Sequence, residues 1–182
     1  MSGSKERQTM RRSNLWWVWN YDKEEKKLDT LSERGIQLEK PGMFTATFVM
    51  DASQRYAYRM DYQPDIKWRQ AKREEYLAFY RDAGWEYLGQ CTQWHYFRRP
   101  WSDSDQMDIY TDAQSLKNHY QRIRWTIGGV LLIEILGLIG EVFNAHYAEK
   151  DLSIWPIVWV MAVLDVFLAY GFLQITRKYH RL

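Results

Sequence analysis

The sequence predicts an α+β protein: a ferredoxin-like β-α-β-β-α-β cytoplasmic domain followed by a two-helix transmembrane hairpin. Three observations support this prediction. Residues 1–124 are rich in charge, whereas residues 125–175 carry only Glu134, Glu141 and Asp165 outside the short segment 149–151. Two stretches of this second part are apolar over about the 20 residues that cross a bilayer. The first part alternates strand-like and helix-like patterns.

Composition divides the chain into five expected parts. These are a disordered basic tail (1–13), the ferredoxin-like domain (14–101), a linker with a juxtamembrane helix (102–124), two transmembrane helices (125–143 and 154–175) and a basic cytoplasmic tail (176–182). The first tail lacks the apolar core of a cleaved secretory signal. The single cysteine excludes an internal disulfide framework and fits a reducing compartment.

The elements of the domain follow from patterns along the chain. The aromatic run 14–21 predicts a strand, and residues 22–35 predict a helix that ends at Gly35. Residues 36–50 predict strand structure with a Pro-Gly turn, and residues 55–63 alternate with the period of a strand. A second helix ends at Gly84, and residues 85–101 predict the last strand.

An offset of 49 positions superimposes two segments of the domain. Glu25, Leu28, Leu31, Gly35, Leu38 and Phe48 coincide with Glu74, Leu77, Tyr80, Gly84, Tyr87 and Phe97. Two such halves make a ferredoxin-like sandwich with helices on one face of an antiparallel sheet. The predicted outer strands do not follow the offset, so the expected repeat is partial.

The flanks of the apolar stretches predict a hairpin in the inner membrane with both termini in the cytoplasm. Basic residues gather at the outer ends, whereas the connecting loop has only Lys150 beside two acids. Trp125, Tyr147 and Trp155 stand where interfacial aromatics are expected. Thr111 with Gln114 predicts a capping box for a helix that runs into the first span. The alternative is a buried hairpin of a soluble protein.

Three carboxylic acids interrupt the apolar stretches. In an antiparallel hairpin centred near position 149, Glu134 lies level with residue 164, beside Asp165, whereas Glu141 lies nearer the boundary. Two ionised carboxylates at one depth would repel, so the pair predicts a shared proton or a basic or polar partner from a second polypeptide. The acids then hold the helices together, couple to protons or ions, or recognise a basic transmembrane partner.

The aromatic content predicts an interaction surface. A ferredoxin-like sheet has one face free of its own helices, and aromatics fall on both faces of its strands. The candidate binding face comprises Trp17, Trp19, Tyr58, Trp94 and Tyr96. Arg59 and Asp61 are interpreted as a solvated cross-strand pair, or else as residues that line a site. A net charge of +2 and no RNA-binding motif argue against nucleic acid as a partner.

No reactive constellation is visible in the sequence. Cys91 and His95 fall on one face of the predicted last strand without a third member, which favours ordinary packing over a nucleophilic pair. The other histidines lack metal-ligand spacing, and there is no glycine-rich phosphate loop. We therefore expect no enzyme activity, no metal and no cofactor.

Three blocks of the domain resemble a known family. "WVWNYDKEEKKLDTLSERGIQLEK", "YAYRMDY" and "EYLAFYRDAGWEYLGQCTQWHYFRRP" are similar to the bacterial membrane proteins of the domain of unknown function 2812, over residues 16–101. The resemblance implies a soluble domain followed by hydrophobic helices. It also implies a regulatory or stress-response setting, because genes of the family often stand beside PadR-like regulators. It brings no active site, and Ile36 departs from the aromatic residue usual there.

These observations predict a two-span membrane protein that acts by binding. We expect a non-enzymatic sensor, adaptor or accessory subunit that binds a partner or ligand through its cytoplasmic domain. Its partners are the lipid bilayer and either another membrane protein or further copies of the chain. The alternative is a small proton- or ion-coupled transport component that uses the intramembrane carboxylates.

Overall fold

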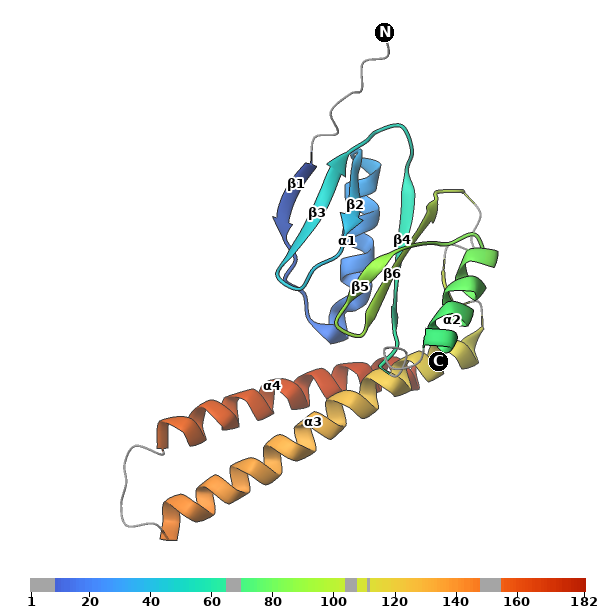
Figure 1. Cartoon of the computed structure of the whole chain (residues 1–182). Helices are drawn as coiled ribbons and strands as arrows, with labels where there is room; N and C mark the ends of the chain where they lie inside the picture. The colour runs from blue at the N-terminus through green and yellow to red at the C-terminus, as the bar shows by residue number, and fades with distance from the viewer. Residues whose placement is uncertain (1–8, 65–69, 104–107, 111, 148–154) are drawn as a thin grey trace. The chain divides into compact units, whose positions relative to one another are not determined.

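Two structural units follow one another along the chain, Met1–Asp112 and Ala113–Leu182. The computed structural model describes residues 9–64, 70–103, 108–110, 112–147 and 155–182 (Figure 1). The elements of the first unit are β1 (Thr9–Ser13), η1 (Val18–Asn20), α1 (Tyr21–Glu33), β2 (Ile36–Lys40), β3 (Thr45–Met50), β4 (Tyr56–Tyr62), α2 (Gln70–Asp82), β5 (Glu86–Cys91) and β6 (Trp94–Pro100). The second unit consists of α3 (Ala113–Tyr147) and α4 (Trp155–His180).

The six strands of the first unit form two small antiparallel sheets. The strand order is β1-β3-β2 in one sheet and β4-β6-β5 in the other. Each sheet is therefore built from consecutive strand, helix, strand and strand elements, with the last strand in the middle (Figure 1). The α+β class is as predicted, but the structure does not confirm the single sheet of a ferredoxin-like domain.

The strands of the two sheets pair at corresponding positions. Leu38 pairs with Phe48 in the first sheet and Tyr87 pairs with Phe97 in the second, and the ladder shifts directly after Leu38 and directly after Tyr87. The first strands follow the same rule, because β1 pairs Met10 with Phe48 and β4 pairs Arg59 with Phe97. Corresponding residues in these pairs are all 49 positions apart.

The first strand lies elsewhere than predicted. The aromatic run 14–21 is not a strand: it contains the short η1 helix and leads directly into α1. The polar residues of β1, expected to be a disordered tail, form the strand instead and pair with β3. The aromatics of the run are held by tertiary packing, which overrides their intrinsic preference for strands.

Both helices of the first unit end at the predicted glycines. Gly35 and Gly84 adopt positive φ angles of 74° and 82°, the left-handed conformation that terminates helices. A Cβ atom at Gly35 would also lie 2.9 Å from the Cβ of Ala52, so the position requires glycine on two grounds.

Helix α1 binds the free edge of strand β4. Three alternate backbone N–H groups of β4 donate to side chains of α1: Tyr56 to Ser32 at 2.7 Å, Tyr58 to Asp29 at 2.7 Å and Met60 to Glu25 at 2.8 Å. Four helical residues rise about 6 Å, close to the span of two strand residues, so one helix face matches alternate N–H groups. A helix of the first half thus satisfies the edge strand of the second sheet and joins the halves.

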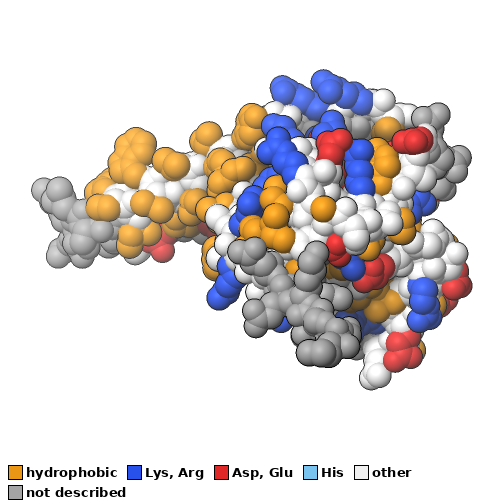
Figure 2. Space-filling model, turned by 90° about the horizontal axis from the view of Figure 1, so that it is seen from above, with side chains coloured by type: hydrophobic (Ala, Val, Ile, Leu, Met, Phe, Trp, Pro, Cys, Tyr) orange, Lys and Arg blue, Asp and Glu red, His pale blue; other side chains and the backbone are white. Residues whose placement is uncertain are grey.

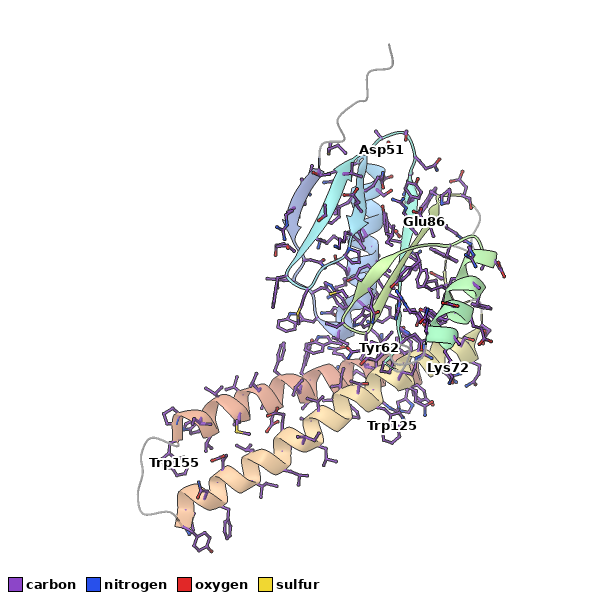
Figure 3. All side chains as sticks on the ribbon, viewed as in Figure 1. Asp51, Tyr62, Lys72, Glu86, Trp125 and Trp155 are labelled. Atoms are coloured by element: carbon purple, nitrogen blue, oxygen red, sulfur yellow. The ribbon has the colours of Figure 1, made fainter. Side chains whose placement is uncertain are left out.

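The second unit contains two helices long and apolar enough to cross a membrane. Only 6% and 17% of their most apolar windows are buried, unlike the core helices of a soluble protein. Figure 2 shows hydrophobic side chains along the hairpin, and Figure 3 places Trp125 and Trp155 toward its two ends. These features indicate a membrane protein.

Helix α3 is continuous over 35 residues, so the predicted juxtamembrane helix does run into the first span. Thr111 of the predicted capping box, and most of the connecting loop, lie outside the described residues.

Candidate functional site

The predicted aromatic binding face is not an exposed surface. Only Trp17 is exposed, at 56%, and the other four residues lie in the core: Trp19, Tyr58, Trp94 and Tyr96. The prediction was wrong because it assumed one sheet with an open face. Tyr58, for example, is enclosed where the halves meet: its hydroxyl donates to Gln37 Oε1 and accepts the Leu38 N–H, both at 3.0 Å.

Trp94 is the centre of one aromatic cluster in this core. The rings of Trp16, Tyr21 and Tyr62 lie 5.1–5.2 Å from its own. These distances are typical of packed aromatic pairs. The aromatic residues of this part of the chain therefore build the interior of the domain.

A buried carboxylate, Asp61, is the most unusual polar group of the first unit. Its side chain is fully buried, and Oδ2 accepts hydrogen bonds from Gln63 at 2.9 Å, Tyr76 at 2.9 Å and Tyr80 at 3.1 Å. Tyr110 donates to Oδ1. Donors of this kind compensate a buried carboxylate for its lost hydration. Burial and the adjacent carboxylate raise the pKa of Tyr76, which keeps its hydroxyl a donor.

His95 lies directly opposite Asp61 in the β4–β6 ladder. Its imidazole is fully buried, and among the described residues neither ring nitrogen has a hydrogen-bond partner. Burial lowers the pKa of His95 to about 4, although Asp61 acts in the opposite direction. The ring is therefore neutral at pH 7 and contributes packing against Tyr76, whose ring centre is 5.2 Å away.

Cys91 and His95 do not share a strand. Cys91 ends β5 and pairs with Trp94, the first residue of β6, so a tight turn separates the two residues. Burial raises the pKa of the Cys91 thiol, which disfavours the nucleophilic thiolate. The structure thus brings no nucleophile and base together here.

A short segment after β6 returns to bind the second sheet. Its residues Asp108, Ile109 and Tyr110, here called the strap, make three kinds of contact. Asp108 pairs with Arg59 at 3.2 Å, Ile109 packs on the core cluster around Phe97, and Tyr110 donates to the buried carboxylate. Helix α3 begins at Ala113, three positions after the strap ends. Along the chain, the strap that contacts the buried carboxylate directly precedes α3, the first of the two candidate membrane helices.

Arg59 is a partly buried cation among acids, not one member of a solvated pair. Its guanidinium contacts Asp29 of α1 at 2.9 Å as well as Asp108 of the strap. Glu25, one helical turn before Asp29, is half-buried, and this burial raises its pKa to about 8 despite the attraction of Arg59. The solvated Arg59–Asp61 pair is therefore not what the structure has, because Asp61 is buried and Arg59 pairs with Asp29 and Asp108.

In the second unit, two contacts establish how the helices lie alongside each other. A Cβ atom at Gly137 would lie 3.3 Å from the Met161 methyl group, and one at Gly128 would lie 3.1 Å from the Phe172 ring. In two antiparallel helices, residues at the same level have a nearly constant sum of position numbers, and this sum is 298 for Gly137 with Met161 and 300 for Gly128 with Phe172. Glu134 is therefore level with residues 164–166, as the sequence predicted.

Among the described acids of the hairpin, Asp165 is the most completely buried. Its side chain is 8% exposed, and neither carboxylate oxygen has a hydrogen-bond partner among the described residues. Asp165 stands one turn from Met161, and Glu134 stands one turn from Gly137, so both acids lie on the contacting faces of their helices. Glu134 and Glu141 are half-buried. All three predicted acids thus lie along one seam between the helices.

Sequence reasoning missed the cluster around Asp61. One signal was present: Asp61 stands between Met60 and Tyr62 in "YRMDY", and an acid there needs hydrogen-bond donors if the strand is buried on both faces. The donors are Gln63, Tyr76 and Tyr80 of α2, and Tyr110 of the strap. Tyr76 and Tyr80 share one helix face, but no spacing rule connects that face with Asp61 or with Tyr110. Among the described residues, no group of three or more His, Cys, Asp or Glu side chains is placed to hold a metal ion.

Comparison with curated proteins and with solved structures finds no match to this chain. One family model does match, over residues 20–132, which include most of the first unit and the beginning of the first apolar stretch. Its description is "Protein of unknown function (DUF2812)". Since the matched segment covers more than half of the chain, the protein belongs to the DUF2812 family.

Proposed function

We propose that the protein is a non-enzymatic membrane adaptor or accessory subunit whose hairpin recognises a partner helix through its carboxylic acids. The partner is a membrane protein with a basic or polar transmembrane residue, or a second copy of the chain. The first unit then acts on the cytoplasmic side of the inner membrane as the part that binds or regulates. Basic residues are more numerous at the outer ends of the two helices than in their connecting loop, which supports this orientation.

One observation carries the proposal: the buried Asp165 has no hydrogen-bond partner among the described residues of the hairpin. In an apolar environment a carboxyl group without a partner is costly, and such groups mark functional positions in membrane helices. A third helix that lies along the seam would meet Glu134 and Glu141 first, because both keep part of their surface open, and would reach the enclosed Asp165 between them.

The strap supports a regulatory role for the first unit. Tyr110 and Asp108, which precede α3 by three and five positions, contact Asp61 and Arg59 of the second sheet. A ligand or partner that changes this sheet acts on the residues directly before the first membrane helix. This arrangement suits an adaptor whose membrane part responds to its cytoplasmic part.

The test is affinity purification of the full chain in mild detergent, followed by mass spectrometry. The wild type is compared with a Glu134→Gln, Asp165→Asn double variant. A Glu39→Gln, Asp103→Asn double variant serves as control, because it removes the same charges from exposed positions of the first unit. We expect a partner, or a second copy, that the wild type and the control retain and the seam variant loses. Equal recovery by all three would contradict the proposal.

A proton- or ion-coupled transport component is the second candidate. It is favoured by the placement of three acids along one seam, with Glu141 two turns beyond the level shared by Glu134 and Asp165. In proteoliposomes, this candidate predicts a pH-dependent flux that Asp165→Asn abolishes. If the protein is an adaptor, neither the wild type nor the Asp165→Asn variant should produce a flux.

We also propose that the two halves of the first unit are copies of one strand–helix–strand–strand unit. The shared offset of 49 positions in the pairing of all three strands supports this proposal. Each half expressed alone is then expected to expose the strand edges that α1 and the opposite half cover.

A further inference from the structure

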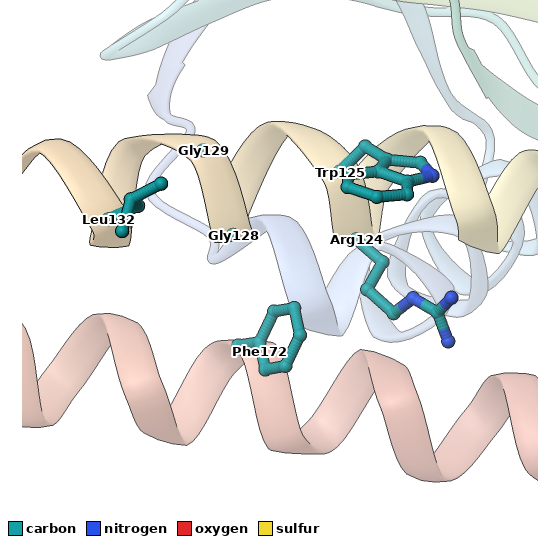
Figure 4. A pocket seen from close by; sticks show the side chains of 6 residues that line it. All are labelled: Arg124, Trp125, Gly128, Gly129, Leu132 and Phe172. Atoms are coloured by element: carbon teal, nitrogen blue, oxygen red, sulfur yellow. The ribbon is translucent and has the colours of Figure 1, made fainter.

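The hairpin carries a groove toward the end where its basic residues gather. The groove has a volume of about 440 Å³ and is lined by Arg124, Trp125, Gly128, Gly129, Leu132 and Phe172 (Figure 4). We propose that it binds one anionic phospholipid, with the phosphate at Arg124 and an acyl chain over the two glycines. This site is separate from the seam acids and does not rest on the proposed function.

The floor of the groove is shaped by its two glycines. Gly128 lets the helices approach closely, because a Cβ atom there would lie 3.1 Å from the Phe172 ring. Gly129 faces open space, since a Cβ atom there would meet nothing within 4 Å among the described residues. Trp125 and Leu132 stand two turns apart on either side of this floor, as Figure 4 shows. The result is an apolar channel on a membrane helix.

Arg124 gives the groove a charged end. Its guanidinium lies 4.5 Å from the ring centre of Tyr179 on α4, a contact that holds the cation beside the channel. Arg177 and Lys178 in the last turn of α4 add positive charge at the same end of the hairpin. From Arg124 to Leu132 the helix rises about 12 Å, so the charge and the apolar floor are arranged like a phosphate and the upper part of an acyl chain.

Charge complementarity selects this occupant over an apolar helix. A parallel transmembrane helix from a second copy would cover the glycines but would bring a second set of basic residues to the level of Arg124. A phospholipid phosphate lies at the depth of the Trp125 interfacial belt, where basic residues attract anionic headgroups.

The test is native mass spectrometry of the full chain released from mixed micelles of phosphatidylglycerol and phosphatidylcholine with equal acyl chains. We expect the wild type to retain one phosphatidylglycerol with a preference of about fivefold, the factor that one arginine supplies near an anionic surface. Gly129→Leu fills the channel and should abolish retention. Gly140→Leu is the matched control, because Gly140 is also exposed on α3 and faces open space, outside the groove.

Two further variants test the charged end. Arg124→Gln should remove the preference for phosphatidylglycerol, whereas Arg34→Gln, which removes the same charge from an exposed position of the first unit outside the lining, should keep it. Equal retention of both lipids by the wild type, or equal retention by the Gly129→Leu and Gly140→Leu variants, would overturn the proposal. So would a Gly129→Leu protein that keeps its lipid but loses a dimer, which would make the groove a docking face for a second copy.

Discussion

Tyr110 donates a hydrogen bond from its hydroxyl to Oδ1 of Asp61, a fully buried carboxylate in the middle of the second sheet. The two residues are 49 positions apart, and the bond attaches the end of the strap to strand β4. Because α3 begins three residues later, this contact lies directly before the first of the two candidate membrane helices along the chain.

Removing that hydroxyl should loosen the strap. We expect Tyr110→Phe to lower the free energy of unfolding of the first unit by about 1–3 kcal/mol, the usual effect of depriving a buried group of a hydrogen bond. Tyr76→Phe should have a smaller effect, because Tyr80 and Gln63 still donate to the same oxygen, Oδ2. Tryptophan fluorescence during urea unfolding of the full chain in detergent measures both. A Tyr110→Phe protein as stable as the wild type would show that the strap is not held by this bond.

Protonation of His95 should destabilise the first unit in acid. The pKa of His95 is about 4 in the folded protein and 6.5 in an ordinary setting, so the unfolded chain binds more protons between these values. Stability therefore rises with pH from about 4 to 6.5, by at most about 3 kcal/mol. In His95→Gln this rise should shrink, as measured by the unfolding free energy at several pH values. Identical pH slopes in both proteins would refute the assignment.

Glu25 should act in the opposite direction at higher pH. Burial raises the pKa of Glu25 from 4.5 to about 8, so the folded protein binds more protons between these values and loses stability as pH rises through that interval. Glu25→Gln keeps an acceptor for the Met60 N–H and removes the titration. The difference in unfolding free energy, Glu25→Gln minus wild type, should therefore be larger at pH 8 than at pH 5. Glu33→Gln, an exposed change on the same helix, should show no such trend.

A substitution in the turn between β5 and β6 should stabilise the first unit. Thr92 has a φ angle of 54° in the two-residue turn between Cys91 and Trp94, a conformation that disfavours residues with a Cβ atom. Thr92→Gly should raise the unfolding free energy by about 1 kcal/mol, whereas Thr92→Ala should not. Thermal unfolding of the two variants distinguishes them, and an equal effect of both would show that the turn is not strained at this position.

The sequence predicted those features that depend on local pattern and on helix geometry. Glycine capping at Gly35 and Gly84 follows from backbone preference alone. The level of Glu134 with Asp165 follows from the length of the connection, because antiparallel helices of equal rise must return in register. The two apolar helices follow from composition.

The rest was decided by long-range packing. Strand β1 is polar and exposed at most positions, so no periodicity reveals it, and its pairing with β3 stabilises it instead. Without that strand, the offset of 49 positions covers only part of each half, and the pattern fits a single ferredoxin-like sheet. The exposure of the aromatic residues was then misjudged, since Trp94 and Tyr96 lie inside two sheets braced by α1 and α2.

The central claim, that the seam acids recognise a basic transmembrane helix, is tested most directly with a defined partner. A synthetic apolar helix of about 20 residues with one central lysine, and its leucine counterpart, are incorporated with the labelled full chain into vesicles. We expect energy transfer with the lysine helix only, and its loss in the Glu134→Gln, Asp165→Asn variant. Equal transfer with both helices, or transfer that survives the double substitution, would contradict the claim.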